Sequence, residues 1–168
     1  MCVRGDIQKK LTEDMEDTHS PAAAHRMLKK FAGLAAQKRS NIHQGYVIGA
    51  FLQALMCSRV LVIIDRYYGV FFPEFADYCG KPLLLKKAMY GMTLSGKYWY
   101  QVLMEFLISI GFIQSTVIKC LFFKKLTDGS VIFLLNYVDD MLYYGSSDDA
   151  LLTFEIQLSE RFNLETKG

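Results

Sequence analysis

The sequence predicts an α+β fold in which helices pack on one face of a small, mainly antiparallel sheet. Two apolar runs, at 121–125 and 130–136, flank the turn sequence at 127–129 and predict a β-hairpin. Apolar residues also recur at helical spacing over 95–111. The 168 residues, 52% of them hydrophobic, are enough for one sizeable core but not for two comfortable domains. We therefore expect one globular unit.

Residues 20–39 are predicted to form the first helix. Ser20 and Pro21 supply a helix cap and a first-turn proline. The residues on its apolar face are Met27, Phe31, Leu34 and Ala35. We interpret the basic side chains off this face as solvated surface, with a phosphate contact as the alternative. Before this helix, residues 1–18 fit either a short strand followed by a loop or a loose terminus.

Short elements and a long connection occupy the middle of the chain. Residues 43–48 are expected to form a strand, and residues 50–55 a short helix. The β-branched run at 60–64 is typical of a strand that is buried on both faces. A connection rich in Tyr, Phe, Pro and Gly then continues as far as Gly80.

Two further helices follow this connection. Ser95 is a candidate cap for a helix that Gly111 ends, and this helix has the clearest apolar periodicity in the chain. Trp99 lies on its apolar stripe, so we interpret it as a core aromatic. Ser147 is expected to cap a last helix over 148–162, whose apolar residues are spaced to face the sheet.

Two adjacent carboxylates, Asp139 and Asp140, lie where the second strand of the hairpin meets a third strand at 141–145. Holding two negative charges together is unfavourable, so such a pair marks either a solvated turn or a site neutralised by a divalent cation. Spacing alone favours the solvated turn. Both interpretations stay open at this point.

Charge and cysteine content narrow the class of protein. The net charge of +2 divides into +8 for residues 1–125, with 17 Lys/Arg against 9 Asp/Glu, and −6 for 126–168, with 2 against 8. A basic body beside an acidic end is suited to holding phosphates in one place and metal ions in another. Four widely spaced cysteines, with no C-x-x-C pair, suggest neither a zinc ribbon nor a dense disulfide framework, and favour a reducing compartment. No stretch approaches the ~20 apolar residues of a membrane span, so we expect a soluble, unexported chain.

The context of the two aspartates resembles a known family. Residues 85–100, LKKAMYGMTLSGKYWY, resemble the segment L-x-K-A-L-Y-G-L-x-x-S-x-x-x-W of copia-type retrotransposon polymerases. The tetrapeptide Tyr137-Val138-Asp139-Asp140 looks like the YxDD motif of reverse transcriptases. Residues 3–8 and 18–21 look like two motifs that lie upstream in the same family. The similarity covers nearly the whole chain in the family's order.

This resemblance implies a single reverse-transcriptase-like domain with the palm of a right-hand polymerase. Residues 1–40 correspond to partial fingers and the first palm helix, and residues 41–168 correspond to the palm with its catalytic β-hairpin. The thumb and the RNase H portion are expected to be absent from this chain.

Roles in the site also come from the resemblance. Asp139 and Asp140 correspond to the catalytic, metal-binding turn, with Asp139 the stronger metal ligand. By the same resemblance, the motif that holds the template strand and the incoming nucleotide contains Tyr90, Gly91 and Ser95. Phe51 occupies the aromatic position that lies beneath the sugar and disfavours a ribose 2′-hydroxyl. General chemistry supports these assignments, because clustered carboxylates hold the Mg²⁺ ions of phosphoryl transfer and glycine lets a backbone approach a base closely.

The same resemblance implies a cofactor and partners. The cofactor is Mg²⁺, with Mn²⁺ as an alternative, provided that the metal still binds. The partners are an RNA or DNA primer–template, a deoxynucleoside triphosphate and the remainder of a retroelement polyprotein, with no membrane involved. The implied location is intracellular, in the cytoplasm or in a virus-like particle.

One departure from the family pattern lies at the expected third carboxylate. The family has D-[VI]-x-x-A-F-L, with an aspartate that bridges both metals, and this chain has Tyr46 at that position. A neutral phenol supplies no bridging charge, so we expect the rate to fall by several orders of magnitude. Neither Asp65, which stands where the family has proline, nor Glu105 is an obvious substitute.

Two classes of function therefore remain from the sequence. The first is an RNA- or DNA-templated DNA polymerase domain, active or formerly active. The second is a non-catalytic relic of a retroelement that at most binds nucleic acid through its basic body. An unrelated metal- or nucleotide-binding module would require the match at 85–100 to be accidental.

Overall fold

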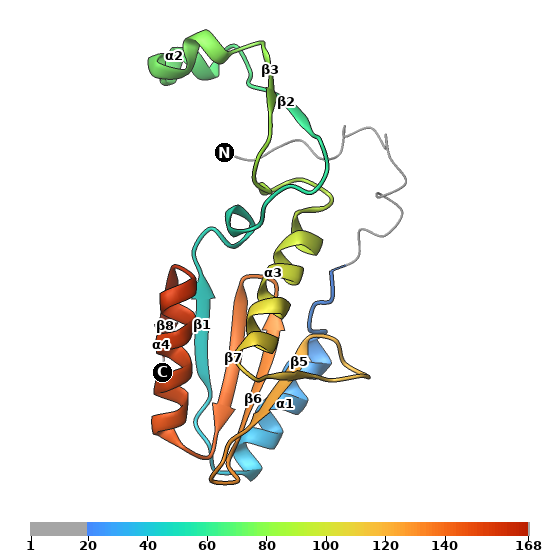
Figure 1. Ribbon diagram of the computed structural model, residues 1–168, viewed down its shortest axis with the longest axis vertical. Helices are drawn as coiled ribbons and strands as arrows, with labels where there is room; N and C mark the ends of the chain where they lie inside the picture. The colour runs from blue at the N-terminus through green and yellow to red at the C-terminus, as the bar shows by residue number, and fades with distance from the viewer. Residues whose placement is uncertain (1–19, 168) are drawn as a thin grey trace.

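A six-stranded antiparallel sheet forms the centre of the computed structural model (Figure 1). The strands follow one another across the sheet in the order β4 (Ile113–Gln114), β5 (Leu121–Lys125), β6 (Val131–Tyr137), β7 (Asp140–Gly145), β1 (His43–Val47) and β8 (Leu164–Lys167). The prediction of a mainly antiparallel sheet is confirmed. The structure describes residues 20–167, so the predictions for residues 1–18 lie outside the described residues.

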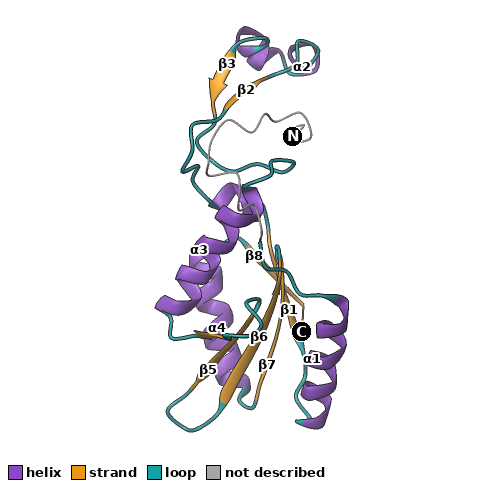
Figure 2. Ribbon diagram, turned by 90° about the vertical axis from the view of Figure 1, so that its right-hand side faces the viewer, coloured by secondary structure: helices purple, strands orange, loops and turns teal. Residues whose placement is uncertain are grey.

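Helices cover both faces of this sheet (Figure 2). The helices are α3 (Ser95–Ser109) and α4 (Asp148–Arg161) on one face and α1 (His25–Gln37) on the other. The prediction that helices pack on a single face is therefore wrong. Helices cover both faces because the central strands carry apolar side chains on both sides. Leu134 packs with α3 and α4, whereas Leu135 packs with α1.

The apolar stripes predicted for the last two helices are confirmed. The side chains of these stripes that are buried against the sheet are Trp99, Leu103 and Leu107 of α3 and Leu151, Phe154 and Leu158 of α4. Burying a side chain of this size stabilises the fold by roughly 1.5–3 kcal/mol, which makes this face the main core. Within residues 20–167, no helix has the length and apolar character needed to cross a membrane.

The ends of the helices agree only in part with the sequence predictions. Ser147 caps α4 as predicted, because its hydroxyl accepts a hydrogen bond from the Ala150 amide at 3.3 Å. The first helix begins later than predicted, with Ala24 in the capping position and Pro21 outside the helix. Ser95 is the first residue of α3 rather than its cap. Gly111, with a φ of +93°, follows α3 as predicted, since glycine adopts this left-handed conformation readily.

The apolar face predicted for α1 is also partly wrong. Phe31 and Ala35 are buried in the core beneath α1, and the Phe31 ring lies 4.8 Å from that of Tyr144. Leu34, which was assigned to the same face, is 52% exposed. Fewer side chains of α1 are therefore buried against the sheet than the helical spacing of its apolar residues predicted.

A separate arm, residues 55–87, projects from the end of the sheet (Figures 1 and 2). Its elements are β2 (Leu61–Ile63), α2 (Tyr68–Phe71), the 3-10 helix η4 (Pro73–Tyr78) and β3 (Pro82–Leu84), with β2 and β3 paired as a two-stranded sheet. The prediction of a strand buried on both faces at 60–64 is wrong, because Leu61 and Ile63 are 56% and 68% exposed. Their β-branched and aliphatic composition fits a strand, but no other layer of the described chain covers it.

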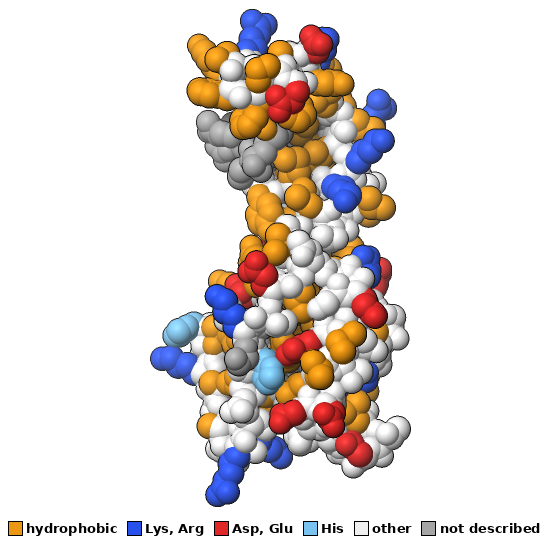
Figure 3. Space-filling view, turned by 90° about the vertical axis from the view of Figure 1, so that its left-hand side faces the viewer, with side chains coloured by type: hydrophobic (Ala, Val, Ile, Leu, Met, Phe, Trp, Pro, Cys, Tyr) orange, Lys and Arg blue, Asp and Glu red, His pale blue; other side chains and the backbone are white. Residues whose placement is uncertain are grey.

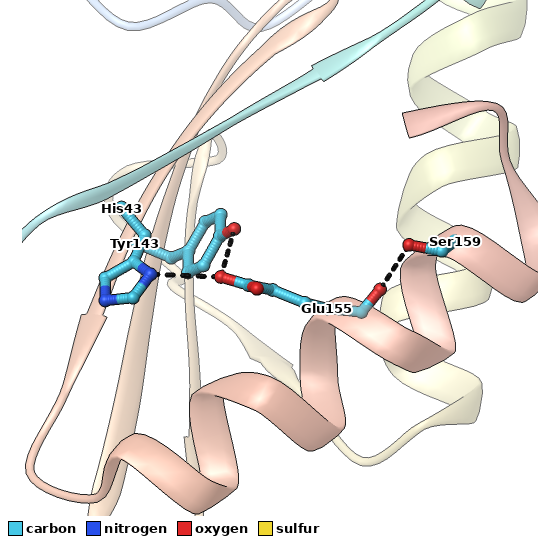
Figure 4. Close-up of polar contacts among 4 residues, drawn as sticks. All are labelled: His43, Tyr143, Glu155 and Ser159. Atoms are coloured by element: carbon cyan, nitrogen blue, oxygen red, sulfur yellow. Dashed lines mark hydrogen bonds and ion pairs between the residues drawn. The ribbon is translucent and has the colours of Figure 1, made fainter. Parts of the chain in front are cut away.

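Strand β1 is tied to its neighbours by side chains as well as by its backbone (Figure 4). The Tyr143 hydroxyl donates a hydrogen bond of 2.8 Å to Glu155 Oε1, and His43 Nδ1 lies 3.0 Å from the same oxygen. Burial and the adjacent Glu155 carboxylate raise the pKa of Tyr143, so this phenol stays neutral and donates at neutral pH. Strands β1 and β7 and helix α4 are thereby joined at one carboxylate.

Candidate active site

The turn between β6 and β7 carries the two aspartates. Tyr137 pairs with Asp140, which leaves Val138 and Asp139 as the two residues of the turn. Val138 has a φ of +58°, a left-handed conformation that is unfavourable for a β-branched residue. The surrounding structure holds this conformation: Trp99 Nε1 donates to the Val138 carbonyl at 2.7 Å, and the Val47 amide donates to the Asp139 carbonyl at 2.9 Å.

Each of the two carboxylates has a neutral hydrogen-bond donor nearby. The Tyr90 hydroxyl lies 3.4 Å from Asp139 Oδ2, at the long end of a hydrogen bond. Gln44 Nε2 donates to Asp140 Oδ1 at 3.1 Å. Burial and the charge of Asp139 raise the pKa of Tyr90, so Tyr90 remains a donor at neutral pH. The two charges are thus held by polar but uncharged neighbours.

Tyr46 lies directly across from the second aspartate. In the register of β1 and β7, Tyr46 pairs with Asp140, and on its other side it pairs with Glu165 of β8. Residues paired in this way project from the same face of a sheet. Together with Gln44 and Lys167 they line a shallow pocket of about 190 Å³. Position 46 is therefore adjacent to Asp140 in space.

An aromatic pair adjoins the first aspartate. Phe51 lies on the 3-10 helix η3 (Ala50–Gln53), and its ring centroid is 4.5 Å from that of Tyr90. Because Tyr90 also approaches Asp139, the structure brings Phe51, Tyr90 and Asp139 into one continuous contact. A flat aromatic surface can pack against a ring of a ligand, and the carboxylate beside it would meet a phosphate favourably only through a bound cation.

Gly91 and Ser95 occupy the loop that leads from Tyr90 into α3. Gly91 is exposed and has a φ of +91°, so it makes a turn that a residue with a side chain would adopt only with strain. Ser95 is completely buried, and its hydroxyl donates to the Met89 carbonyl at 2.6 Å. Its observed contact closes the loop at 89–95, so the structure does not bring its side chain to the surface beside the two aspartates.

Three residues near the turn were missed as site residues. Gln44 had no distinctive sequence signal, because its link to Asp140 depends on strand register. Trp99 was expected to be a core aromatic, and it is 1% exposed, yet its indole nitrogen also holds the turn. Glu165 lies in a strand that the sequence analysis did not predict.

The donor set at the turn fits a divalent cation only in part. Carboxylate oxygens are the ligands that Mg²⁺ and Mn²⁺ prefer, and Asp139 and Asp140 supply them. In the part of the chain that the structure describes, however, no group of three or more His, Cys, Asp or Glu side chains could hold a metal ion. Tyr46, which pairs with Asp140 across β1 and β7, adds a phenol to this turn rather than a carboxylate.

Comparison with known proteins gives this turn a family context. A family model described as "Reverse transcriptase (RNA-dependent DNA polymerase)" matches residues 1–168, which is the whole chain. The chain belongs to the reverse transcriptase family. This reverse transcriptase domain has an Asp-Asp turn, a neighbouring aromatic pair and a tyrosine opposite the second aspartate.

Relatives of the reverse transcriptase domain are proteins of plant transposons. It is 30% identical over 152 residues to "Retrovirus-related Pol polyprotein from transposon RE1" of Arabidopsis thaliana, a match that covers 90% of this chain and 10% of the relative. The RE2 polyprotein of the same plant is 31% identical over 153 residues, with the same shares covered. The TNT 1-94 polyprotein of Nicotiana tabacum is 26% identical over 171 residues, covering 100% of this chain and 12% of the relative.

These matches confirm the resemblance to copia-type polymerases. The reverse transcriptase domain spans about a tenth of the length of these polyproteins. No solved structure matches the chain significantly.

Proposed function

We propose that this chain is the nucleotidyl-transfer module of a copia-type Pol polyprotein, with its chemistry weakened by the tyrosine at position 46. The observation that carries the proposal is the pairing of Tyr46 with Asp140 across β1 and β7. In this proposal residues 41–168 act as the palm of the polymerase and residues 20–40 contribute the first palm helix. In this proposal the chain acts together with the remainder of a retroelement polyprotein.

Asp139 and Asp140 are the residues that we propose would hold Mg²⁺ or Mn²⁺. Their oxygens are hard donors, and their present partners, Tyr90 and Gln44, are neutral and can be displaced. When bound, the ion would supply neutralisation of the developing phosphate charge. This chain contributes two carboxylates to that task, and the third position holds the Tyr46 phenol.

The aromatic pair is proposed to receive the nucleotide. The ring of Phe51 packs on that of Tyr90, which fixes both rings beside Asp139. A rigid ring beneath a deoxyribose makes a wall that a 2′-hydroxyl would strike. We assign the template side to the turn at Gly91, where the absence of a side chain leaves room for a base. Ser95 supports this turn from within, through its bond to the Met89 carbonyl.

Primer extension tests the proposed loss of activity. The purified chain, given a primed RNA template, deoxynucleoside triphosphates and Mg²⁺, is expected to show no measurable extension, because Tyr46 cannot bridge a metal pair. Primer–template binding is measured in parallel by fluorescence anisotropy, and its salt dependence shows whether phosphates are contacted. Robust extension that Asp139→Asn abolishes would overturn the proposed weakening. Absence of both extension and binding would instead mark a chain without polymerase function.

A single reversion tests the placement of Tyr46. Tyr46→Asp is expected to raise the affinity for Mn²⁺ by roughly tenfold or more, since a third carboxylate joins the donor set. Isothermal calorimetry measures this affinity without requiring catalysis. Tyr46→Phe is the matched control and should leave the affinity unchanged, and Tyr46→Asp combined with Asp140→Asn should lose the gain. An unchanged affinity in Tyr46→Asp would show that position 46 does not face the metal.

A further inference from the structure

Helix α1 carries a row of basic side chains on its outer surface. Arg26, Lys30, Leu34 and Lys38 follow one another at intervals of four residues, and all four are exposed. Lys38 caps the helix with helical backbone angles, so the row continues through it. Side chains four residues apart are neighbours on one face of a helix. The outer surface of α1 therefore presents three cations around one exposed leucine.

These cations have no acidic neighbour in the surrounding sequence. Residues 18–64 contain six Lys or Arg residues and no Asp or Glu. In the structure, none of Arg26, Lys30 and Lys38 forms an ion pair with another residue of the described range 20–167. A basic row of this kind favours contact with the acidic groups of another molecule.

Helix α4 carries the opposite pattern. Asp148, Leu152, Ile156 and Glu160 also follow at intervals of four residues, and all four are exposed, with Leu152 at 57% and Ile156 at 51%. Residues 148–162 contain four Asp or Glu residues and one Arg. On the face drawn in Figure 3, Asp and Glu side chains gather over the end of the molecule that lies opposite the arm. Neither Asp148 nor Glu160 has an ion-pair partner within the part of the chain that the structure describes.

The two rows match in length and in charge. Lys38 follows Arg26 by 12 positions. Glu160 follows Asp148 by the same 12 positions, so each row is about 18 Å long. When the rows lie side by side, in either direction, a cation meets a carboxylate at both ends. Rows of side chains four residues apart are also those that interdigitate in the commonest class of helix packing.

The apolar side chains of the two rows coincide as well. In either direction of alignment, Leu34 of the α1 row meets Leu152 or Ile156 of the α4 row. The aliphatic stem of Lys30 then lies over the other of these two side chains, since long basic side chains cover apolar surface while the charged end stays in water. The contact therefore has an apolar centre between two charged ends.

Helices α1 and α4 cannot meet within one chain. They cover opposite faces of the sheet (Figure 2), α1 packing with Leu135 and α4 with Leu134. Contact of α1 with α1, or of α4 with α4, between two copies would bring like charges together. The complementary arrangement is α1 of one copy against α4 of the next. Because one neighbour cannot cover both faces, each copy binds two others, which is the geometry of a head-to-tail chain or ring.

We propose that this chain self-associates head to tail, with the α1 row of one copy packed into the α4 row of its neighbour. The partner is thus a second copy of this chain. One helix pair buries less surface than a stable dimer needs, so the association depends on protein concentration. It also weakens as ionic strength rises, because salt screens exposed ion pairs. The proposal is independent of nucleotidyl transfer.

Sedimentation velocity of the purified chain tests this assembly directly. When the protein concentration is raised roughly hundredfold at low salt, the weight-average sedimentation coefficient is expected to rise past that of a dimer. Raising the salt concentration from about 0.05 to 0.5 M should reverse the rise. A chain that stays monomeric over this range overturns the proposal. A chain that stops at the dimer also overturns it, since a head-to-tail contact leaves a free surface at each end.

Charge reversal identifies the two surfaces. Arg26→Glu with Lys38→Glu is expected to weaken the association roughly tenfold. Asp148→Lys with Glu160→Lys should weaken it to a similar extent. Combined in one chain, the four substitutions exchange the charges of the two rows and should restore the association to within about threefold of the wild type. Circular dichroism verifies that each variant is folded.

Matched variants separate the contact from a general effect of charge. Lys86→Glu with Lys87→Glu, on exposed positions of the arm, changes the net charge as much as the reversal on α1 and should leave the association unchanged. Glu74→Lys with Asp77→Lys, also exposed on the arm, is the corresponding control for α4. Ile156→Gln removes an apolar contact without changing the charge and should weaken the association several-fold.

Binding of RNA by the same variants tests the alternative use of the α1 row. Association that the reversals on α1 and α4 leave unchanged, or that the combined variant fails to restore, overturns the proposal. Fluorescence anisotropy with a labelled RNA is measured in parallel. If the reversal on α1 lowers RNA binding and leaves the association unchanged, the α1 row contacts phosphates instead of a second copy.

Discussion

The conformation of Val138 shows how single side chains hold the candidate site. A left-handed β-branched residue is unfavourable on its own, and here the Trp99 indole and the Val47 amide bond the two carbonyl groups of the turn. Trp99 thus contributes a hydrogen bond to the turn in addition to its packing in the core. A phenylalanine at this position would provide most of the packing and none of the hydrogen bonding.

Trp99→Phe is therefore expected to lower the free energy of unfolding by about 1–3 kcal/mol, because it leaves the Val138 carbonyl without its donor and removes part of a buried ring. Urea denaturation measures this change. Hydrogen exchange at the Val47 amide should also become faster, since this amide bonds to the same turn. Tyr98→Phe is the control, as its hydroxyl lies against Ser58 of the arm, and it should leave exchange at Val47 unchanged.

The raised pKa of Tyr143 should make the free energy of unfolding depend on pH in the alkaline range. Burial, with the adjacent Glu155 in second place, raises its pKa well above the ordinary value of 10.0. As the pH rises through about 10, the unfolded chain releases the phenolic proton and the folded chain keeps it, so the free energy of unfolding falls. The fall amounts to at most about 1.4 kcal/mol per pH unit for one such group.

The expected result is a shallower decline in Tyr143→Phe than in the wild type between about pH 10 and 11. Urea denaturation at several pH values measures both slopes. Tyr67→Phe, at a position that is 77% exposed, is the control and should keep the wild-type slope. Equal slopes for the wild type and Tyr143→Phe would contradict this assignment.

At the scale of elements, features that depend on residues close in sequence were predicted better than features that depend on distant segments. The hairpin around 127–129, the helix ended by Gly111 and the Ser147 cap were predicted correctly, because turns, caps and helical periodicity depend on neighbouring residues. The sequence analysis did not predict the exposure of β2 or the position of α1 on the opposite face of the sheet. An apolar run has the same composition whether a second layer covers it or not, so its burial depends on distant segments.

Two glycines predict opposite effects of the same substitution. Gly111→Ala should lower the free energy of unfolding by about 1 kcal/mol, because its φ of +93° is strained for alanine. Gly33→Ala should raise it by roughly 0.5–1 kcal/mol, because a Cβ in the middle of α1 would meet nothing within 4 Å. Thermal denaturation of both variants beside the wild type measures the two shifts. Shifts of the same sign would show that one of these backbone positions differs from that described.

At the scale of the whole molecule, the site depends on register between strands that are distant in sequence. The Asp-Asp turn was predicted from a contiguous motif, and Phe51 and Tyr90 from family positions. Their mutual contact was not predictable from spacing, since it brings 51, 90 and 139 together through tertiary packing. The same holds for Glu165, because its strand β8 pairs with β1, which is distant in sequence.

Helix α3 connects the main core to the arm, so damage to its buried face should affect the whole fold. Leu107→Ala is expected to lower the free energy of unfolding by about 2–5 kcal/mol, because Leu107 is 0% exposed and its loss leaves a cavity. Ile108→Ala changes the next residue of the helix, which is 51% exposed, and should cost less than about 1 kcal/mol. Urea denaturation gives both values, and similar losses in the two variants would contradict the described orientation of α3.

The pairing of Tyr46 with both Asp140 and Glu165 also bears on how the stability of the sheet depends on metal ions. An aspartate at position 46 would complete a row of three acidic side chains across three adjacent strands. Like charges directly opposite one another destabilise a sheet, and a divalent ion bound to the row would offset that cost. With tyrosine at position 46, the pairing of these three strands does not depend on a bound ion.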